Sequence, residues 1–194
     1  GYTSINQLRE RGVTEAVLEK LADADVFRSI GKDRRKALWE VTTKDFQAQG
    51  LFSEQRSTTA TEERVELPEM AISEHVVHDY AALSLSLKAH PVSFVRKELE
   101  QLHVRSIASL EAAKDKDLVK VAGLILVRQR PGTASGICFI TIEDETGNAN
   151  LVVFKDRFDK YRKEIIQSRL LMVEGQLQRE GEVVHVIVSR CYNF

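Results

Sequence analysis

The chain of 194 residues is 43 % hydrophobic and 29 % charged, and its 28 basic side chains nearly balance 29 acidic ones. This length suffices for one or two hydrophobic cores, and no apolar run reaches the roughly 18 residues that a membrane span needs. The first residues lack the basic-then-apolar order of a secretory signal, so we expect a cytoplasmic protein with no membrane partner. A net charge of −1 argues against binding polyanions by bulk charge, so nucleic-acid contacts would need local basic patches.

Residues 1–52 carry helical signals. The sequence Ser4-Ile5-Asn6-Gln7 predicts a capping box, and Thr14 is a suitable N-cap for a second helix. Gly31 lies in a short break before residues 33–41, where alanine, leucine and valine form an apolar stripe at helical spacing. The pattern predicts a helix, a tight glycine-containing hairpin and a helix.

The middle of the chain is divided between a polar stretch and two further helices. Residues 53–72 are mostly polar and without periodicity, which predicts an exposed linker. Ser73 is expected to cap the first helix, and the pair His90-Pro91 to open the second. Residues 73–115 are therefore predicted to form a helical hairpin that serves as a connector.

Residues 116–194 change to the two-residue period of strands. Strands are predicted near 118–128, 136–144, 149–154, 170–177 and 183–188, with a helix over 157–166. Three strands, one helix and two strands is the element order of the OB-fold, a five-stranded barrel. The predicted class is thus α+β: a helical N-terminal module, a helical linker and a C-terminal OB barrel.

Several motifs in this order resemble the C-terminal region of bacterial error-prone DNA polymerases, C-family enzymes related to the polymerase III alpha subunit. The motifs are RQRPGTA at 128–134, EDETG at 143–147, NLVVF at 150–154, LSLKAHP at 85–91 and ADADVF at 22–27. The resemblance extends from about Tyr2 to Arg190 and identifies residues 1–52 as a helix-hairpin-helix module. One departure is Ser84, where the family pattern leads us to expect glycine.

This resemblance implies a function in DNA synthesis. The catalytic carboxylates of such a polymerase, and the magnesium that it uses, are expected upstream of Gly1, so we expect no catalytic residue or cofactor in this chain. The implied parent enzyme extends primers in translesion synthesis after DNA damage. The implied partners are single-stranded and primer-template DNA and the catalytic domain of the same polymerase.

The barrel offers candidate DNA ligands in its loops and on its second and third strands. Arg128 and Arg130 flank the first loop and Arg179 lies at the last hairpin, and guanidinium groups suit both phosphates and bases. Phe139 and Phe154 are stacking platforms if they point outward, and core residues if they point inward. The alternation of the strand does not decide between these two.

The helical module offers a second candidate site at its hairpin. Backbone N–H groups near Gly31 can face a phosphate, with Lys32, Arg34 and Arg35 adding positive charge. The alternative is that this glycine only makes a turn between two helices.

Metal and thiol chemistry have weak signals. His75 and His78 share a helix face that either holds a metal or is merely solvated, and Glu143-Asp144-Glu145 is either a magnesium site or turn chemistry. Cys138 and Cys191 lie in no Cys-x-x-Cys spacing, so two free thiols are expected.

Two functions remain open from the sequence. The first is a noncatalytic DNA-binding region in which the barrel engages the single-stranded template and the helix-hairpin-helix grips the duplex backbone. The second is a protein-interaction platform that docks mutagenesis accessory proteins or the sliding clamp, which the even charge balance favours.

Overall fold

The computed structural model describes residues 1–42, 67–133, 135–181 and 183–194, and the chain divides into unit 1, Gly1–Lys88, and unit 2, Ala89–Phe194. Most of the predicted linker, residues 53–66, lies outside the described residues. Across the parts that the structure describes, no helix combines the length and apolar character needed to cross a membrane.

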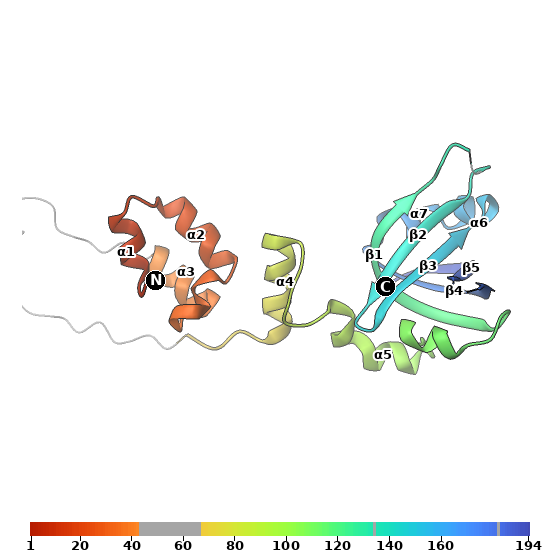
Figure 1. The fold of residues 1–194 in the computed structure, drawn as a ribbon, viewed down its shortest axis with the longest axis horizontal. Helices are drawn as coiled ribbons and strands as arrows, with labels where there is room; N and C mark the ends of the chain where they lie inside the picture. The colour runs from red at the N-terminus through yellow and green to blue at the C-terminus, as the bar shows by residue number, and fades with distance from the viewer. Residues whose placement is uncertain (43–66, 134, 182) are drawn as a thin grey trace, which may run out of the picture. The chain divides into compact units, whose positions relative to one another are not determined.

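The helices of unit 1 begin and end at local signals. Ser4 caps the first helix by accepting a hydrogen bond from the Gln7 N–H at 3.4 Å, while Gln7 Oε1 accepts from the Thr3 N–H at 3.0 Å. Gly31 ends the 3₁₀ turn in the left-handed region at φ +77°, which glycine adopts without strain. The described helices of this unit are α1 (Ile5–Glu10), α2 (Glu15–Asp23), η1 (Val26–Ile30), α3 (Arg34–Thr42) and α4 (Ile72–Leu83) (Figure 1).

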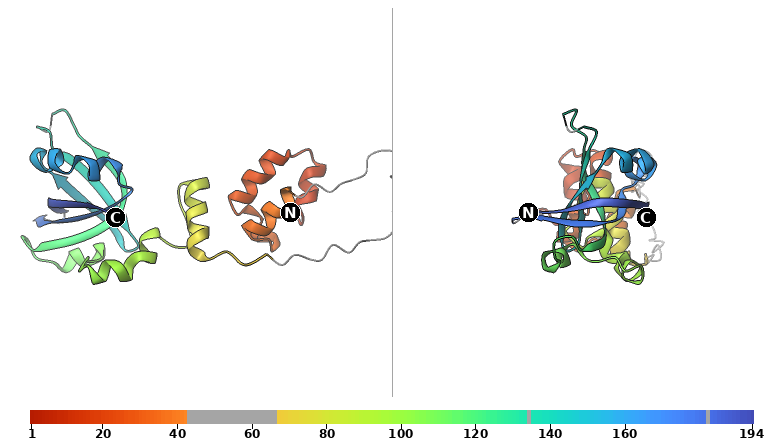
Figure 2. Two further views of the ribbon diagram at one scale, coloured as in Figure 1. Left: turned by 180° about the vertical axis from the view of Figure 1, so that it is seen from behind. Right: turned by 90° about the vertical axis from the view of Figure 1, so that its right-hand side faces the viewer.

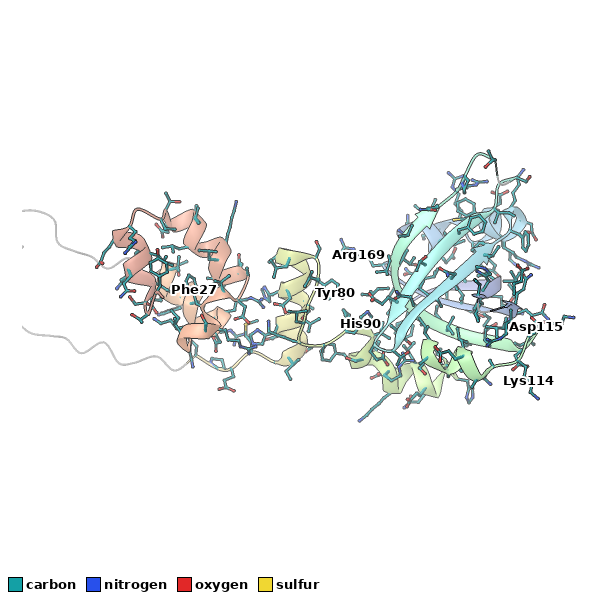
Figure 3. All side chains as sticks on the ribbon, in the orientation of Figure 1. Phe27, Tyr80, His90, Lys114, Asp115 and Arg169 are labelled. Carbon is teal, nitrogen blue, oxygen red and sulfur yellow. The ribbon has the colours of Figure 1, made fainter. Side chains whose placement is uncertain are left out.

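The core of unit 1 is formed by one apolar face from each of its first four helices. Phe27 of η1 points into this core, as Figure 3 shows, and is only 5 % exposed. The apolar stripe predicted on α3 is confirmed, because Ala37 and Val41 are both buried. The buried members of this core are Ile5, Leu18, Ala22, Phe27, Ala37 and Val41.

Helix α4 begins earlier than predicted, and its end explains why glycine was expected in place of Ser84. Its N-cap is Ala71, so Ser73 lies inside the helix rather than capping it. Its C-cap is Ser84, which is held in the left-handed region at φ +62°. This is a backbone conformation that favours glycine, which gives a physical reason for the glycine expected here from the family pattern.

The predicted connector at 73–115 is not one hairpin, because the boundary between the units falls inside it. Asp79 of α4 is ion-paired with Arg34 of unit 1, whereas Leu99 packs with Met172 of unit 2. Each helix therefore has its buried partners in a different unit. The second half of the predicted connector contains η2 (Pro91–Val95), α5 (Arg96–Gln101) and η3 (Ile107–Ala112).

Unit 2 contains the closed five-stranded barrel, and the predicted OB-fold is confirmed. The strand order is β1-β2-β3-β5-β4, closed by β4 pairing with β1; β3 and β5 run parallel and the other neighbouring pairs run antiparallel. The strands are β1 (Leu118–Gln129), β2 (Cys138–Asp144), β3 (Gly147–Val153), β4 (Leu170–Glu180) and β5 (Val183–Asn193). Between β3 and β4 lie two short helices, α6 (Lys155–Lys160) and α7 (Arg162–Gln167), where one helix was predicted.

The barrel is sealed by alternate side chains that point inward. Cys138 and Cys191 are among them, and both are free thiols as predicted. Burial raises the pKa of Cys191 to about 12, so this thiol stays protonated. Gly175 is required where β4 meets β5, because a Cβ there would lie 2.4 Å from the Ile187 carbonyl oxygen.

Figures 1 and 2 show how the helices and loops lie around the barrel. The β1–β2 connection projects at the same end of the barrel as α6 and α7. The residues of that connection and the start of α6 are therefore brought together, although about 25 positions separate them in the sequence.

Candidate nucleic-acid interface

Phe139 lies on the outer face of the barrel. Its strand neighbours Cys138 and Ile140 are 2 % and 1 % exposed, whereas Phe139 itself is 40 % exposed. Since successive side chains of a strand point to opposite faces, the barrel interior takes the first two and leaves the phenyl ring outside. Of the two orientations left open by the sequence, the structure has the one that suits stacking.

Phe154 shares this outer face. It follows β3 in extended backbone and is 44 % exposed. Val152 pairs directly with Phe139 across β2 and β3, so Phe154, two residues further along, is the diagonal neighbour of that ring. Two exposed aromatic rings are therefore gathered at one end of the β2–β3 face.

The remainder of the face is polar and ends in negative charge. Thr141 pairs with Asn150, and the Thr141 hydroxyl donates to Asn150 Oδ1 at 3.1 Å. Further along, Glu143 is opposite Asn148. The face thus changes from aromatic, beside α6, to amide and hydroxyl groups and then to a carboxylate.

Arg128 and Arg130 lie at the aromatic end, and each has a partner inside unit 2. The Arg128 guanidinium donates to the carbonyl of Ser168, the C-cap of α7. The Arg130 guanidinium lies 4.4 Å from the centroid of the Phe158 ring and donates from Nε to the Gly136 carbonyl at 3.3 Å. Both side chains are held in place, and both residues remain exposed.

Arg179 is engaged in holding a helix rather than free at the hairpin. Its Nη2 donates to the carbonyls of Leu110, Glu111 and Ala113, at 3.3, 2.9 and 3.3 Å. Its backbone N–H donates to Asp115 Oδ1 at 3.0 Å, and Figure 3 places Asp115 just before β1. The Nη2 group is thus engaged by the carbonyls at the end of η3, and we expect these bonds, rather than the predicted DNA contact, to be its main role.

The hairpin of unit 1 uses its N–H groups internally. The Gly31 N–H donates to the Arg28 carbonyl at 3.0 Å, and the Lys32 N–H to the Phe27 carbonyl at 3.2 Å. The Lys32 ammonium is ion-paired with Glu40, and burial lowers its pKa. The alternative in which Gly31 only makes a turn accounts for these contacts.

Arg34 is buried, and the prediction that it contacts a phosphate is wrong. It is 1 % exposed and donates to the Asp23 carbonyl at 2.7 Å, to the His75 carbonyl at 3.1 Å and to Asp79. A guanidinium without solvent access cannot reach DNA unless the helices separate.

Arg35 is half-buried and held by the segment that leads into α4. It donates to the Pro68 carbonyl at 2.7 Å and to Glu74 at 3.3 Å. Its charge is thus partly balanced within unit 1.

Neither histidine interpretation describes His75. This residue is 5 % exposed on the inner face of α4, and its Nδ1 lies 3.5 Å from an Arg34 nitrogen, whereas His78 is exposed. Burial lowers the pKa of His75, and the neighbouring Lys88 and Arg34 charges act in the same direction. Among residues 1–42, 67–133, 135–181 and 183–194, no three His, Cys, Asp or Glu side chains are grouped so as to hold a metal.

The acidic run at 143–145 is turn chemistry. The Asp144 carboxylate accepts from the N–H groups of Thr146 and Gly147 at 2.7 and 3.1 Å, and from the Ile107 N–H at 2.8 Å. It also accepts from Arg96 at 2.9 Å. These donors occupy the oxygens that a magnesium ion would require, so the residues do not fit that metal.

Lys155 is an exposed cation that the sequence analysis did not single out. It directly follows Phe154 and begins α6. The available signal was local charge density, since residues 155–163 contain five basic and two acidic side chains. This helical segment adds positive charge at the aromatic end of the face.

Comparison with known proteins agrees with this geometry. Residues 119–193 match the family model described as an OB-fold nucleic acid binding domain. The chain is 49 % identical over 195 residues to error-prone DNA polymerase 1 of Rhizobium meliloti (strain 1021), a match that covers 97 % of it. The resemblance to error-prone DNA polymerases is confirmed.

A second polymerase agrees, and both relatives are much longer than this chain. The error-prone DNA polymerase of Caulobacter vibrioides is 45 % identical over 193 residues, covering 95 % of this chain. The chain spans 18 % of the Rhizobium polymerase and 17 % of the Caulobacter polymerase. Among solved structures, the hypothetical protein ygiW from E. coli has 16 % identity and a TM-score of 0.37, covering 47 % of this chain and 89 % of that one, a likeness too low to carry weight.

Proposed function

We propose that this chain is a noncatalytic DNA-binding region of an error-prone polymerase, and that its barrel binds single-stranded template on the β2–β3 face. The observation that carries the proposal is the pair Phe139 and Phe154, 40 % and 44 % exposed on one face beside a basic helix. Exposed aromatic rings next to cations are the combination that binds single strands, since bases stack on the rings and phosphates meet the charges.

The face favours binding that tolerates different sequences. Phenyl rings stack on every base, and Thr141 and Asn150 bond mainly to each other. Phosphate contacts carry no sequence information. Such a surface suits a polymerase region that must hold whatever template arrives, damaged bases included.

The remaining activities of the proposed parent enzyme are assigned elsewhere. Nucleotide transfer, its magnesium ion and its role in translesion synthesis would belong to the catalytic part of a longer polymerase that acts on chromosomal DNA in the cytoplasm. Within this chain, the acidic run at 143–145 does not supply a magnesium site, because Arg96 and backbone N–H groups already occupy Asp144.

The proposal does not extend to a duplex grip by unit 1. A duplex grip would need the hairpin N–H groups, Lys32 and Arg34 to be available to phosphates. These groups instead form hydrogen bonds and ion pairs within unit 1. Lys36 is exposed on α3, and its ammonium group forms no ion pair with a described residue. A single cation is nevertheless too little for such a grip.

The test is fluorescence anisotropy of a labelled oligothymidylate with the whole 194-residue chain and with Phe139→Ala and Phe154→Ala. Each substitution is expected to weaken binding by roughly 10-fold, because a stacked base contributes about 1–3 kcal/mol. Phe94→Ala is the matched control, since Phe94 is 41 % exposed but lies in η2. Equal losses in all three variants, or no binding at low salt, would contradict the proposal.

A second candidate, the protein-interaction platform, is favoured by a different surface. Leu83, Leu85 and Leu87, at the end of α4 and just after it, are 50 %, 52 % and 96 % exposed. Exposed apolar side chains gathered in one short segment are typical of protein contacts. A pull-down with purified sliding clamp and accessory proteins distinguishes the two candidate functions. If the double variant Leu85→Ser, Leu87→Ser loses partner binding but keeps its affinity for the oligonucleotide, the protein-interaction platform is supported.

A further inference from the structure

The Arg130 guanidinium is positioned on an aromatic platform at the aromatic end of the barrel. Its carbon lies 4.4 Å from the centroid of Phe158, a ring that is itself 7 % exposed and part of the barrel core. The Nε group donates to the Gly136 carbonyl at 3.3 Å. Stacking and this hydrogen bond together fix the plane of the guanidinium, while its Nη groups stay beside the β1–β2 connection.

Lys155 converges on the same place. Gly136 has a φ of +83°, and a Cβ on it would lie 3.2 Å from both Cγ and Cδ of Lys155 and 3.3 Å from Nη2 of Arg130. Both side chains therefore border one small space over Gly136. The missing side chain leaves that space open, and the positive φ is a conformation that other residues rarely adopt.

The charge at this place is not balanced within unit 2. In the described parts of the chain, neither Arg130 nor Lys155 forms an ion pair. Arg130 and residues 155–160 together supply four cations and two carboxylates. Both carboxylates, Asp156 and Asp159, line the adjoining pocket with Phe154 and Lys155, and Asp156 also lies 3.5 Å from its neighbour Arg157. The cations therefore outnumber the carboxylates here by two. Because neither of these two cations is ion-paired with a described carboxylate, an anion at the space over Gly136 would be attracted by both.

We propose that Arg130 and Lys155 form a phosphate clamp that holds the backbone of the strand whose bases stack on Phe154 and Phe139. The planar guanidinium takes two phosphate oxygens, and the ammonium adds a point charge. Because Phe158 already fixes Arg130, little side-chain freedom is lost on binding. This inference rests on the proposed function and adds Lys155 and Gly136 to its site.

The experiment measures how binding of the whole chain falls with salt. An oligothymidylate and an abasic oligonucleotide of equal length are titrated from low to moderate salt with the wild type, Lys155→Gln and Arg130→Gln. Each phosphate contact to a single strand contributes about 0.7 to the slope of log K against log[salt], so each substitution should lower the slope by about 0.7 for both ligands. Lys163→Gln, which removes an equal charge from exposed α7, is the matched control and should leave the slope nearly unchanged.

The outcomes separate the clamp from the proposed function. The clamp is supported when Lys155→Gln lowers the slope, Lys163→Gln does not, and melting shows both variants folded. It is overturned when oligothymidylate binds and weakens on Phe139→Ala, while Lys155→Gln keeps the wild-type slope or matches the Lys163→Gln control. If oligothymidylate does not bind at all, the proposed function itself fails and the clamp with it.

Discussion

Arg34 of α3 and Asp79 of α4 form a buried ion pair across 45 positions of sequence, with side chains that are 0 % and 5 % exposed. Lys88 and Ser86 also donate to the Asp79 carboxylate, at 2.8 and 2.7 Å. Buried charges are tolerated only when they are paired and hydrogen-bonded, so this cluster fixes α4 against the helices before it.

Substitution of Arg34 is expected to destabilise unit 1. Arg34→Met removes one partner of a buried pair and should lower the free energy of unfolding by about 3 kcal/mol. Arg35→Met is the control, because that half-exposed pair with Glu74 should contribute less than about 1 kcal/mol. Chemical denaturation followed through Trp39, which lies in α3, reports on this unit. Equal effects of the two substitutions would contradict the importance of the buried pair.

Unit 1 should lose stability in acid. Burial raises the pKa of Asp79, but hydrogen bonds from Lys88, Ser86 and Arg34 outweigh this and lower it to about 2, from a usual value of 3.8. Because the pKa of Asp79 is lower in the folded chain, protons bind preferentially to the unfolded chain. The contribution of the Asp79 carboxylate to the stability of unit 1 is therefore complete above pH 4 and is lost as pH falls toward 2. Its size is about 2 kcal/mol. Denaturation at several pH values measures it, and the Asp79→Asn variant should lack this part of the pH dependence.

Replacing Ser84 by glycine, the residue expected from the family pattern, should increase the stability of unit 1. At φ +62° a serine is strained where a glycine is not, so Ser84→Gly should stabilise unit 1 by about 1 kcal/mol despite the greater freedom of glycine when unfolded. Ser73→Gly inside the same helix is the opposite control and should destabilise it. Thermal melting distinguishes the two, and a loss of stability in Ser84→Gly would show that the strain is absent.

Asp144 should be essential for the stability of the barrel. Its fully buried carboxylate accepts from Arg96 and from the N–H groups of Ile107, Thr146 and Gly147. Asp144→Ala leaves the three backbone N–H groups without this acceptor, while Arg96 keeps Glu145, and should cost about 3 kcal/mol or more.

Glu145 provides the comparison for Asp144. It also pairs with Arg96 but is 23 % exposed, so Glu145→Ala should cost markedly less. Urea unfolding of unit 2 tests this ranking. A reversed order would show that the ion pair between Arg96 and Glu145 contributes more to stability than the hydrogen bonds from the backbone to Asp144.

Arg179 should matter for stability and not for DNA. Arg179→Ala removes the donors to three carbonyls at the end of η3 and should cost about 1–2 kcal/mol. Oligonucleotide affinity of the folded variant should stay within about twofold of the wild type. A selective loss of affinity with unchanged melting would contradict this expectation and support the predicted DNA contact.

The sequence by itself determined the elements with local signatures. Alternation at period two predicts the strands, Gly147 and Gly181 mark turns, and the order of strands and helix predicts the OB barrel. Ser4 predicts a helix start through a hydrogen bond to a residue three positions away. These features depend on neighbours in the chain, so the chain alone is enough to predict them.

Only the tertiary structure decided which side chains face a ligand. Alternation separates Phe139 from Ile140, but closure of the barrel determines which of them lies outside. Arg34 and Arg179 resemble free cations in sequence. Arg34, however, is bound by Asp79, 45 positions away, and Arg179 by the carbonyl of Glu111, 68 positions away. Electrostatic and hydrogen-bond partners are set by distance in space, and no local pattern of residues records that distance.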